Sequence, residues 1–306
     1  MSTELALRPI RVSVVGDSPA AVYQLERLCL HEELVAHRVF CGADANLPRA
    51  IDCQSVSDWD EVLTDAESEL VFFAWSPDRT QKVIEALSAR KHVLLEGPIA
   101  ATVEEAQSLI QGSENCGRLL DVVDSSFDDD DFQTALDVAR TSAIGKLEAI
   151  HFCLWEMAIP TNGQVDVLWT FGLRITDQLL QLADQPIETV TARKYLGGDE
   201  IIGFHAIIDF DGGLRATLDV HLDSHVPLHS GWSLNGTEGG YRDFSKYTRT
   251  DDGEIYATRL TPTSIDPDHQ LLAIYDHLRK GQVFESNCQR AKAVVELIDR
   301  IRNAND

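Results

Sequence analysis

The sequence lacks the features that would place it in a membrane, in a secretory pathway or on a nucleic acid. None of its apolar runs approaches the ~18 residues that a bilayer span needs. The first residues lack the basic start and the long apolar core of a signal peptide, so we expect a cytoplasmic protein. Basic residues are scarce, because 26 Lys and Arg stand against 50 Asp and Glu and give a formal net charge of −24. Such a charge repels phosphate backbones and anionic membranes, so we expect neither as a partner.

Paired cysteines are missing as well. The six cysteines are scattered without a Cys-x-x-Cys spacing, which predicts reduced, structural thiols and no zinc site. An acidic run at residues 128–131 is better explained as the first turn of a helix than as a metal site, because carboxylates are favoured at the positive end of the helix dipole. The sequence therefore predicts a globular protein without a bound metal.

What the sequence does contain is an alternation of strand and helix patterns in its first part. Apolar runs predict strands at residues 10–15, 35–41, 70–74, 92–95 and 119–123. Amphipathic stretches between them predict helices, and this order is typical of parallel βαβ units. Residues 1–124 are therefore predicted to form a Rossmann-type dinucleotide-binding domain of the α/β class.

The pattern changes after residue 124. A helix, a long strand and a second helix are followed by several alternating strands, and two helices close the chain. Residues 125–306 are therefore predicted to form an α+β domain for substrate binding and oligomerisation. Its open-faced, mostly antiparallel sheet is expected to be backed by helices.

The turn after the first predicted strand stands where a dinucleotide-binding fold has Gly-x-Gly-x-x-Gly. Gly16 keeps the tight turn, Ser18 replaces the glycine that lets the backbone approach a pyrophosphate, and Pro19 suits a first helical turn. Asp44 follows the second strand at the distance of an acid that binds the adenosine ribose, and a plain turn aspartate is the alternative. The motif leaves open whether cofactor binding is retained or only the fold is.

Two later strand ends resemble signatures of the Gfo/Idh/MocA family of oxidoreductases. Glu96, Gly97 and Pro98 stand where that family has Glu-Lys-Pro, and Ser76 with Pro77 matches its Thr-Pro-Asn segment beside the nicotinamide. A simple Ser-Pro turn and a carboxylate that only holds a turn are the alternatives. Because the Lys–Pro bond of the family is often cis, the resemblance predicts a cis bond between Gly97 and Pro98.

A later helix resembles the family's Asp-x-Gly-x-His-x-x-Asp motif. Gly172 and Asp177 are kept, but Thr170 replaces an aspartate and Arg174 replaces the catalytic histidine. Arginine stays charged at any working pH and cannot act as a base. It can clamp a carboxylate or phosphate of a ligand, or it can pair with Asp177 on the helix surface. Asp177 and Tyr195 remain candidates for the missing base.

The resemblance implies a cofactor, a substrate and an assembly. The cofactor would be NAD or NADP, unless its pocket has been lost, and the small-molecule substrate or ligand would be anionic if Arg174 clamps it. The implied cofactor-binding residues are Gly16, Ser18, Pro19, Asp44, Ser76, Pro77, Glu96 and Pro98. The implied catalytic residues are Glu96, Arg174 and Asp177. The family also implies a homodimer or homotetramer formed through the sheet of the second domain.

Polar residues alternate along one strand of that second domain. Asp219, His221, Asp223 and His225 alternate with apolar residues, so their side chains would share one face of a sheet. Residues two apart on a strand are ~7 Å apart, which is too far for all of them to share one ion. The sequence favours an oligomer interface or a solvated face over a metal site.

Three functions remain open. Oxidation of an alcohol needs a group that takes the hydroxyl proton, and neither Gly97 nor Arg174 can do so. The chain is therefore expected to be an NAD(P)-dependent oxidoreductase with a non-standard or impaired catalytic site. The second possibility is a non-catalytic protein that senses nucleotide or ligand on the same fold. The third is a reductase of the biliverdin reductase type, where hydride delivery to a conjugated substrate needs less of an enzyme base.

Overall fold

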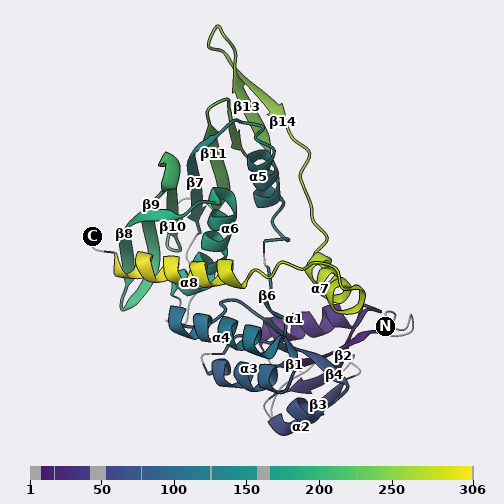
Figure 1. Ribbon diagram of the computed structural model, residues 1–306. Helices are drawn as coiled ribbons and strands as arrows, with labels where there is room; N and C mark the ends of the chain where they lie inside the picture. Colours follow the sequence, from purple (N-terminus) through teal and green to yellow (C-terminus); the bar gives the residue numbers. More distant parts are fainter. Residues whose placement is uncertain are drawn as a thin grey trace. The chain divides into compact units, whose positions relative to one another are not determined.

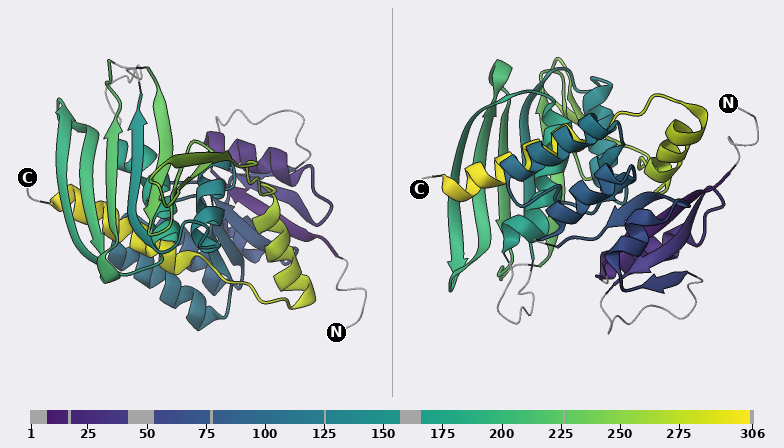
Figure 2. Two further views of the ribbon diagram at one scale, coloured as in Figure 1. Left: turned by 90° about the horizontal axis from the view of Figure 1, so that it is seen from above. Right: turned by 60° about the horizontal axis from the view of Figure 1, so that its bottom comes forward.

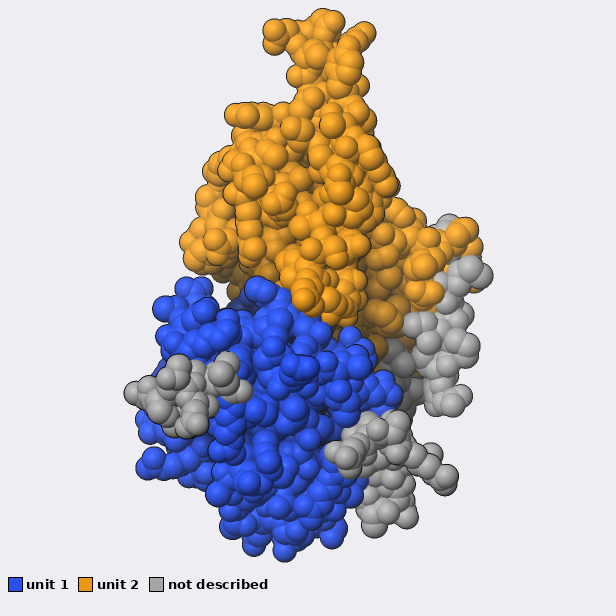
Figure 3. Space-filling view, turned by 90° about the vertical axis from the view of Figure 1, so that its right-hand side faces the viewer, with its two compact units in different colours: residues 1–124, 268–295 blue, residues 125–267, 296–306 orange. Residues whose placement is uncertain are grey.

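The computed structural model describes residues 8–16, 18–41, 53–76, 78–124, 126–156, 166–225 and 227–304. The chain divides into two compact units, unit 1 with residues 1–124 and 268–295, and unit 2 with residues 125–267 and 296–306 (Figure 3). Each unit has its own sheet. In the described part of the chain, no helix is long and apolar enough to cross a membrane, and the cytoplasmic location stays a prediction.

The first boundary between the units coincides with the one expected after residue 124. The second differs from the expectation, because residues 268–295 group with unit 1 and not with the rest of the second half. The reason is apolar burial: Leu271, Ile274 and Tyr275 belong to the core of the first sheet. A late helix of the chain thus completes the nucleotide-binding type of fold formed by its beginning.

Unit 1 is a doubly wound α/β unit (Figure 1). Its strands are β1 (Ile10–Val15), β2 (Leu34–Phe40), β3 (Gln54–Val56), β4 (Ser68–Phe73), β5 (His92–Leu95) and β6 (Leu120–Val122). Its helices are α1 (Pro19–Leu28), α2 (Trp59–Thr64), α3 (Arg79–Ser88), α4 (Val103–Cys116), α7 (His269–Lys280) and the first part of α8 (Cys288–Asn303). The six strands are parallel in the order β3-β2-β1-β4-β5-β6. The chain reverses its winding at β1 and β4, and doubly wound sheets bind nucleotides beyond the carboxyl ends of the strands at such a point.

Strands β1, β4, β5 and β6 of unit 1 are mainly buried on both faces, as their continuous apolar runs predict. Val12 and Val14 of β1 share one core with Leu25 of α1 and Ile274 of α7. Helices α3 and α4 contact β5 and β6, and Val83 of α3 is fully buried. This packing fixes where each strand ends, and with it the positions of the turns at the carboxyl edge.

Unit 2 is built on a broad mixed sheet, seen from two sides in Figure 2. Its strands are β7 (Leu147–Trp155), β8 (Ile187–Gly197), β9 (Glu200–Phe210), β10 (Arg215–His221), β11 (His229–Gly236), β12 (Gly240–Arg242), β13 (Ser245–Arg249) and β14 (Ile255–Arg259). Its helical elements are α5 (Asp130–Arg140), the π-helical turn η2 (Leu168–Gly172), α6 (Leu173–Ala183) and the 3-10 turn η3 (Asp211–Gly213). The order is β14-β13-β12-β11-β7-β10-β9-β8, antiparallel except for the parallel pair β7 and β10. The predicted fold class is confirmed in both units.

The two faces of this sheet differ in the way that period-two alternation predicts. Trp232 on one face is buried, and its ring lies 6.1 Å from that of Phe132 in α5. The opposite face carries polar side chains such as His151 and Asp219, which line a hollow. The acidic run also starts a helix as predicted, because Asp129 caps α5 by accepting the N–H of Phe132.

Candidate functional site

The turn from β1 to α1 leaves no space for a side chain at Gly16. Its φ is +115°, and a Cβ added there would lie 2.7 Å from the Cβ of Ala74. Backbone hydrogen bonds hold this position, since the N–H of Gly16 donates to the carbonyl of Phe40 at 2.9 Å and that of Ala74 to Val15 at 2.9 Å. The close approach of the ends of β1 and β4 therefore requires glycine here.

The start of α1 is the next element of this edge. The Oγ of Ser18 accepts the N–H of Ala21 at 3.2 Å, and Pro19 occupies the first helical turn. A hydroxyl that accepts one hydrogen bond can still donate its own proton, and the first N–H groups of a helix favour an anion. Asp44 and Pro77, which the sequence also assigned to the cofactor, lie outside the residues that the structure describes.

Glu96 holds the turn after β4. Its Oε2 accepts the backbone N–H of Trp75 at 2.7 Å, and its own N–H donates to the carbonyl of Phe73 at 2.8 Å. In the same turn, the hydroxyl of Ser76 donates to the carboxylate of Asp78. Glu96 and Ser76 thus lie at the carboxyl ends of neighbouring strands, and Glu96 performs the turn-holding role considered from the sequence.

Gly97 lies where the resemblance expects lysine. The Gly97–Pro98 bond is cis, so this prediction is confirmed. A Cβ added at Gly97 would meet only the Cγ1 of Val122, at an ordinary contact distance of 3.8 Å. Unlike Gly16, this glycine is not required by the backbone or by its neighbours.

Arg79 was missed by the sequence interpretation, although it lies beneath this edge. It is 3% exposed, and its guanidinium donates to the carbonyls of Phe73 at 3.3 Å, of Ile99 at 3.4 Å and of Pro98. Its guanidinium carbon also lies 4.8 Å from the ring centre of Trp75. Burial lowers the pKa of Arg79 to about 10. One signal could have found it, because a cation in the first turn of a helix opposes the helix dipole.

In unit 2, Arg174 lies in the first turn of α6, directly after the π-helical turn that contains Thr170 and Gly172. Its Nη2 lies 2.9 Å from Oδ2 of Asp129, and the side-chain amide of Gln178 donates to the same oxygen at 3.0 Å. The side chain is 44% exposed. The guanidinium therefore keeps access to solvent and can meet an anion, but it cannot accept a proton.

The candidates for a replacement base lie apart from one another. Oδ2 of Asp177 on α6 accepts a hydrogen bond from Gln181 at 2.9 Å. Tyr195 lies on the polar face of the sheet, where its ring centre is 4.5 Å from that of His221. Helix α6 covers the opposite face, since Gln178 accepts the indole N–H of the buried Trp232 at 3.2 Å. Tyr195 is therefore no partner for Asp177.

A second carboxylate of the acidic run accepts hydrogen bonds from the sheet. Asp131 accepts the backbone N–H of Trp232 at 3.1 Å and the hydroxyl of Tyr241 at 2.8 Å. Burial raises the pKa of Asp131, and burial with this hydrogen bond raises that of Tyr241. The pair connects α5 to β11 and β12 and is part of the framework of unit 2.

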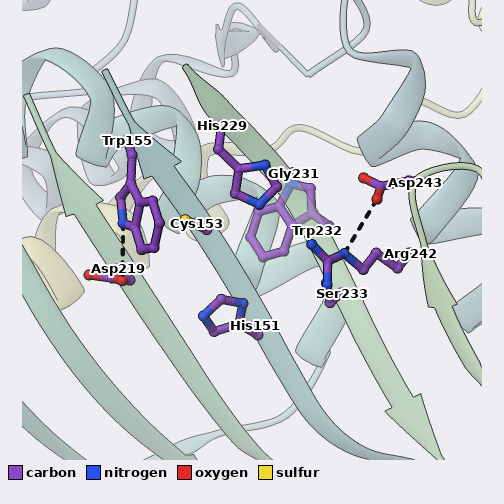
Figure 4. Close-up of a pocket in the computed structure, with 10 residues that line it drawn as sticks. All are labelled: His151, Cys153, Trp155, Asp219, His229, Gly231, Trp232, Ser233, Arg242 and Asp243. Carbon is purple, nitrogen blue, oxygen red and sulfur yellow. Dashed lines mark hydrogen bonds and ion pairs between the residues drawn. The ribbon is translucent and has the colours of Figure 1, made fainter. Parts of the chain in front are cut away.

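The polar face of the sheet contains a hollow of about 400 Å³ (Figure 4). It is lined by His151, Cys153, Trp155, Asp219, His229, Gly231, Trp232, Ser233, Arg242 and Asp243. The indole N–H of Trp155 donates to Asp219 at 3.1 Å, and Nε2 of His221 lies 3.3 Å from the same carboxylate, as the alternation predicted. Over the described ranges, no three His, Cys, Asp or Glu side chains are placed to hold a metal ion. Oligomerisation through this sheet stays a prediction.

Comparison with known proteins finds a family model that matches part of the chain. The Gfo/Idh/MocA family model, an oxidoreductase family with an NAD-binding Rossmann fold, matches residues 11–123. An uncharacterized oxidoreductase of Schizosaccharomyces pombe is 30% identical over 147 residues, which cover 44% of this chain and 39% of that protein. A scyllo-inositol 2-dehydrogenase (NADP+) of Bacillus subtilis is 28% identical over 184 residues, which cover 55% of this chain and 49% of that protein. These alignments thus span half or less of each relative.

Solved structures share the fold over nearly the whole chain. A putative oxidoreductase of Bacillus subtilis superimposes with a TM-score of 0.87 at 18% identity, covering 97% of this chain and 96% of its own. The biliverdin reductase of Synechocystis sp. PCC 6803, solved with biliverdin and NADP+, gives a TM-score of 0.78 at 19% identity and covers 96% and 98%. At such identities the likeness concerns the fold alone.

Proposed function

We propose that the chain is a member of the Gfo/Idh/MocA family of oxidoreductases, whose model with an NAD-binding Rossmann fold matches residues 11–123. It binds NAD or NADP at the carboxyl edge of the sheet of unit 1. The observation that carries the proposal is the close backbone approach at Gly16, where a Cβ would collide with Ala74 at 2.7 Å. The pyrophosphate is held by the N–H groups at the start of α1 and by the hydroxyl of Ser18. Ser76, Glu96 and Pro98 form the nicotinamide side of the same edge.

The proposed activity is hydride transfer by a catalytic site without the usual proton acceptors. The absence of a side chain at Gly97 and the permanent charge of Arg174 remove the groups that would take a hydroxyl proton. Arg174, half-exposed beside Asp129, binds the anionic group of the substrate. Asp177 is the remaining titratable group of the helix motif, and Glu96 positions the turn after β4.

A reductase of conjugated substrates is the second candidate, and Gly97 favours it. Hydride addition to a conjugated system needs no base that removes a hydroxyl proton, so loss of the lysine costs such a reaction little. The cyanobacterial biliverdin reductase shares this fold. A protein that only senses the nucleotide remains the outcome if binding occurs without turnover.

Titration with NADH and NADPH, followed by nucleotide fluorescence, tests the proposal. We expect saturable binding to the native chain and at least a tenfold loss in Gly16→Ala, because the new methyl group would push the ends of β1 and β4 apart. Gly112→Ala is the matched control, since a Cβ at this helical glycine makes only an ordinary 3.8 Å contact with Leu87.

The outcomes separate the functions. No binding at millimolar nucleotide would eliminate both enzyme functions. Binding with oxidation or reduction in a panel of polyols and linear tetrapyrroles supports the oxidoreductase and identifies which of the two substrate classes it uses. Binding that leaves every member of the panel unchanged would replace the proposed activity with nucleotide sensing.

A further inference from the structure

A second hollow, this one in unit 1, lies at the edge of the sheet opposite to the proposed nucleotide site. Its volume is about 450 Å³, within the ~300–1,000 Å³ range of small-molecule pockets. His92 opens β5 and Leu119 precedes β6, so the hollow lies at the amino ends of these strands. Phe284 and Cys288, in the segment from α7 to α8, line its other side.

The hydrogen bonds of His92 fix which of its ring nitrogens carries a proton. The backbone N–H of Leu119 donates to Nδ1 at 3.0 Å, so Nδ1 is the acceptor of the ring. Burial and, after it, the charge of the neighbouring Arg118 lower the pKa of His92 to about 4. The ring is therefore neutral near pH 7, and Nε2 carries its only proton.

This tautomer leaves two donors facing each other. Nη1 of Arg118 lies 3.4 Å from Nε2 of His92, and both nitrogens carry hydrogens. Two N–H groups cannot satisfy one another, whereas an anionic oxygen between them would accept from both. Within the described ranges, the buried Nε of Arg118 also has no hydrogen-bond partner. The donor set is thus incomplete without an acceptor.

The other charged groups around His92 do not supply the missing hydrogen-bond acceptor. Glu69, which would favour a charged imidazole, is engaged by Arg279 at 2.6 Å. His277 turns its Nδ1 to the carbonyl of Gln282 at 2.8 Å. Glu114 at the rim accepts a hydrogen bond from Gln111 at 3.3 Å and is the one carboxylate among the residues that line the hollow.

We propose that this hollow is a ligand site for a small organic anion, a carboxylate or a phosphate monoester with an apolar body. One anionic oxygen lies between Arg118 and the Nε2–H of His92, and the apolar body packs against Phe284, Leu119 and Ile110. The site is separate from the proposed nucleotide edge, because the two lie at opposite ends of the same strands. It therefore goes beyond the proposed oxidoreductase function and does not depend on it.

Titration calorimetry with phenyl phosphate, benzoate and the neutral benzyl alcohol tests the site. We expect at least one anion to bind and benzyl alcohol to bind at least tenfold more weakly, because only an anion satisfies both donors. Comparison of the two anions identifies which head group the site prefers. Arg118→Gln is expected to weaken the anion at least tenfold, whereas Arg90→Gln, at an exposed arginine of the same unit, leaves its affinity unchanged.

Long-range proton–nitrogen NMR of the native chain gives a measurement that needs no variant. Before addition of ligand, His92 should show the Nε2–H tautomer, and the bound anion should shift its Nε2 resonance. The proposal is overturned if both anions bind no better than benzyl alcohol, or if the His92 signals stay unmoved while an anion binds. Equal affinity of a folded Arg118→Gln variant for the anion would overturn it as well.

Discussion

Two arginines show how differently the two units treat the same side chain. Arg79 of unit 1 is 3% exposed and is held by backbone carbonyls, whereas the side chain of Arg174 in unit 2 is 44% exposed and meets one carboxylate of Asp129. Both terminal nitrogens of the buried guanidinium donate to backbone carbonyls, so Arg79 belongs to the framework of the edge, although its Nε has no partner among the described residues. An exposed pair contributes little stability and keeps its cation available to a ligand.

The comparison extends to the two glycines of the motif turns. Gly16 is required by its φ of +115° and by the contact with Ala74, while Gly97 has space for a side chain beside Val122 at 3.8 Å. The nucleotide side of unit 1 is thus constrained by packing, and the position of the family lysine is not. In the proposed function, Gly97 changes the chemistry of the edge, while the space at this position would also admit a Cβ.

Restoring both family side chains should have the largest effect. In Gly97→Lys with Arg174→His, we expect NAD(P)+-dependent oxidation in a polyol panel that includes scyllo-inositol to rise about 100-fold or more, the lower range of a positioned acid–base group. The space beside Gly97 admits a Cβ at an ordinary contact distance from Val122. Gly97→Met with Arg174→His is the control, because it supplies a stem of similar length without an amine. If both double variants oxidise polyols at the native rate, the side chains at positions 97 and 174 do not determine whether the chain oxidises polyols.

Removal of the buried Arg79 should have the second-largest effect. Arg79→Met leaves the carbonyls of Phe73, Pro98 and Ile99 without their donor, so we expect the free energy of unfolding to fall by about 3 kcal/mol or more. Urea denaturation of the variant against Arg90→Met, an exposed arginine of the same unit, measures it. A loss no larger than that of Arg90→Met would show that Arg79 is not part of the framework.

The contrast also explains which features the sequence could predict. The strands and helices follow from local apolar patterns, and β1 and β5 begin and end where the sequence placed them. The cis bond before Pro98 followed from the family motif. The unfavourable place of Arg79 in the first turn of a helix could be noticed in the sequence. Its burial could not be predicted, because it depends on carbonyls at the ends of β4 and β5 that only the folded sheet brings together. The grouping of α7 with unit 1 is likewise a tertiary result, since it rests on the packing of Leu271, Ile274 and Tyr275 in the core of the first sheet.

His92 in unit 1 and Asp131 in unit 2 should respond to acid in opposite directions, and the contribution of His92 should lower stability. The pKa of His92 falls to about 4 in the folded chain, so the unfolded chain binds more protons between about pH 6.5 and 4. The contribution of His92 to the stability of unit 1 should therefore fall by about 2 kcal/mol from pH 7 to pH 5. Hydrogen exchange of the strands of unit 1, corrected for intrinsic rates, measures the change, and His92→Gln should remove it. An unchanged pH response in His92→Gln would assign the loss to other groups.

Asp131 gives unit 2 the opposite sign. Its pKa is raised by burial, so the folded chain holds a proton at higher pH than the unfolded chain does. Its contribution to stability therefore grows as the pH falls through the raised pKa. The difference in free energy of unfolding between the native chain and Asp131→Asn, measured by hydrogen exchange of the amides of β11 and β12, isolates the contribution of Asp131. A native chain that loses stability relative to Asp131→Asn as the pH falls would contradict the burial of this carboxylate.

The smallest effect is expected at Arg174. Arg174→Gln should lower the free energy of unfolding by less than about 1 kcal/mol, because the pair with Asp129 is exposed to solvent. Asp129→Ala is the matched change on the other side of the pair, and it should cost more, since Asp129 also caps α5 and accepts from Gln178. Urea denaturation of both variants beside Arg79→Met places the three losses on one scale. If Arg174→Gln costs as much as Arg79→Met, then Arg174 is a framework residue too, and unit 2 would have no cation reserved for an anionic ligand at this helix.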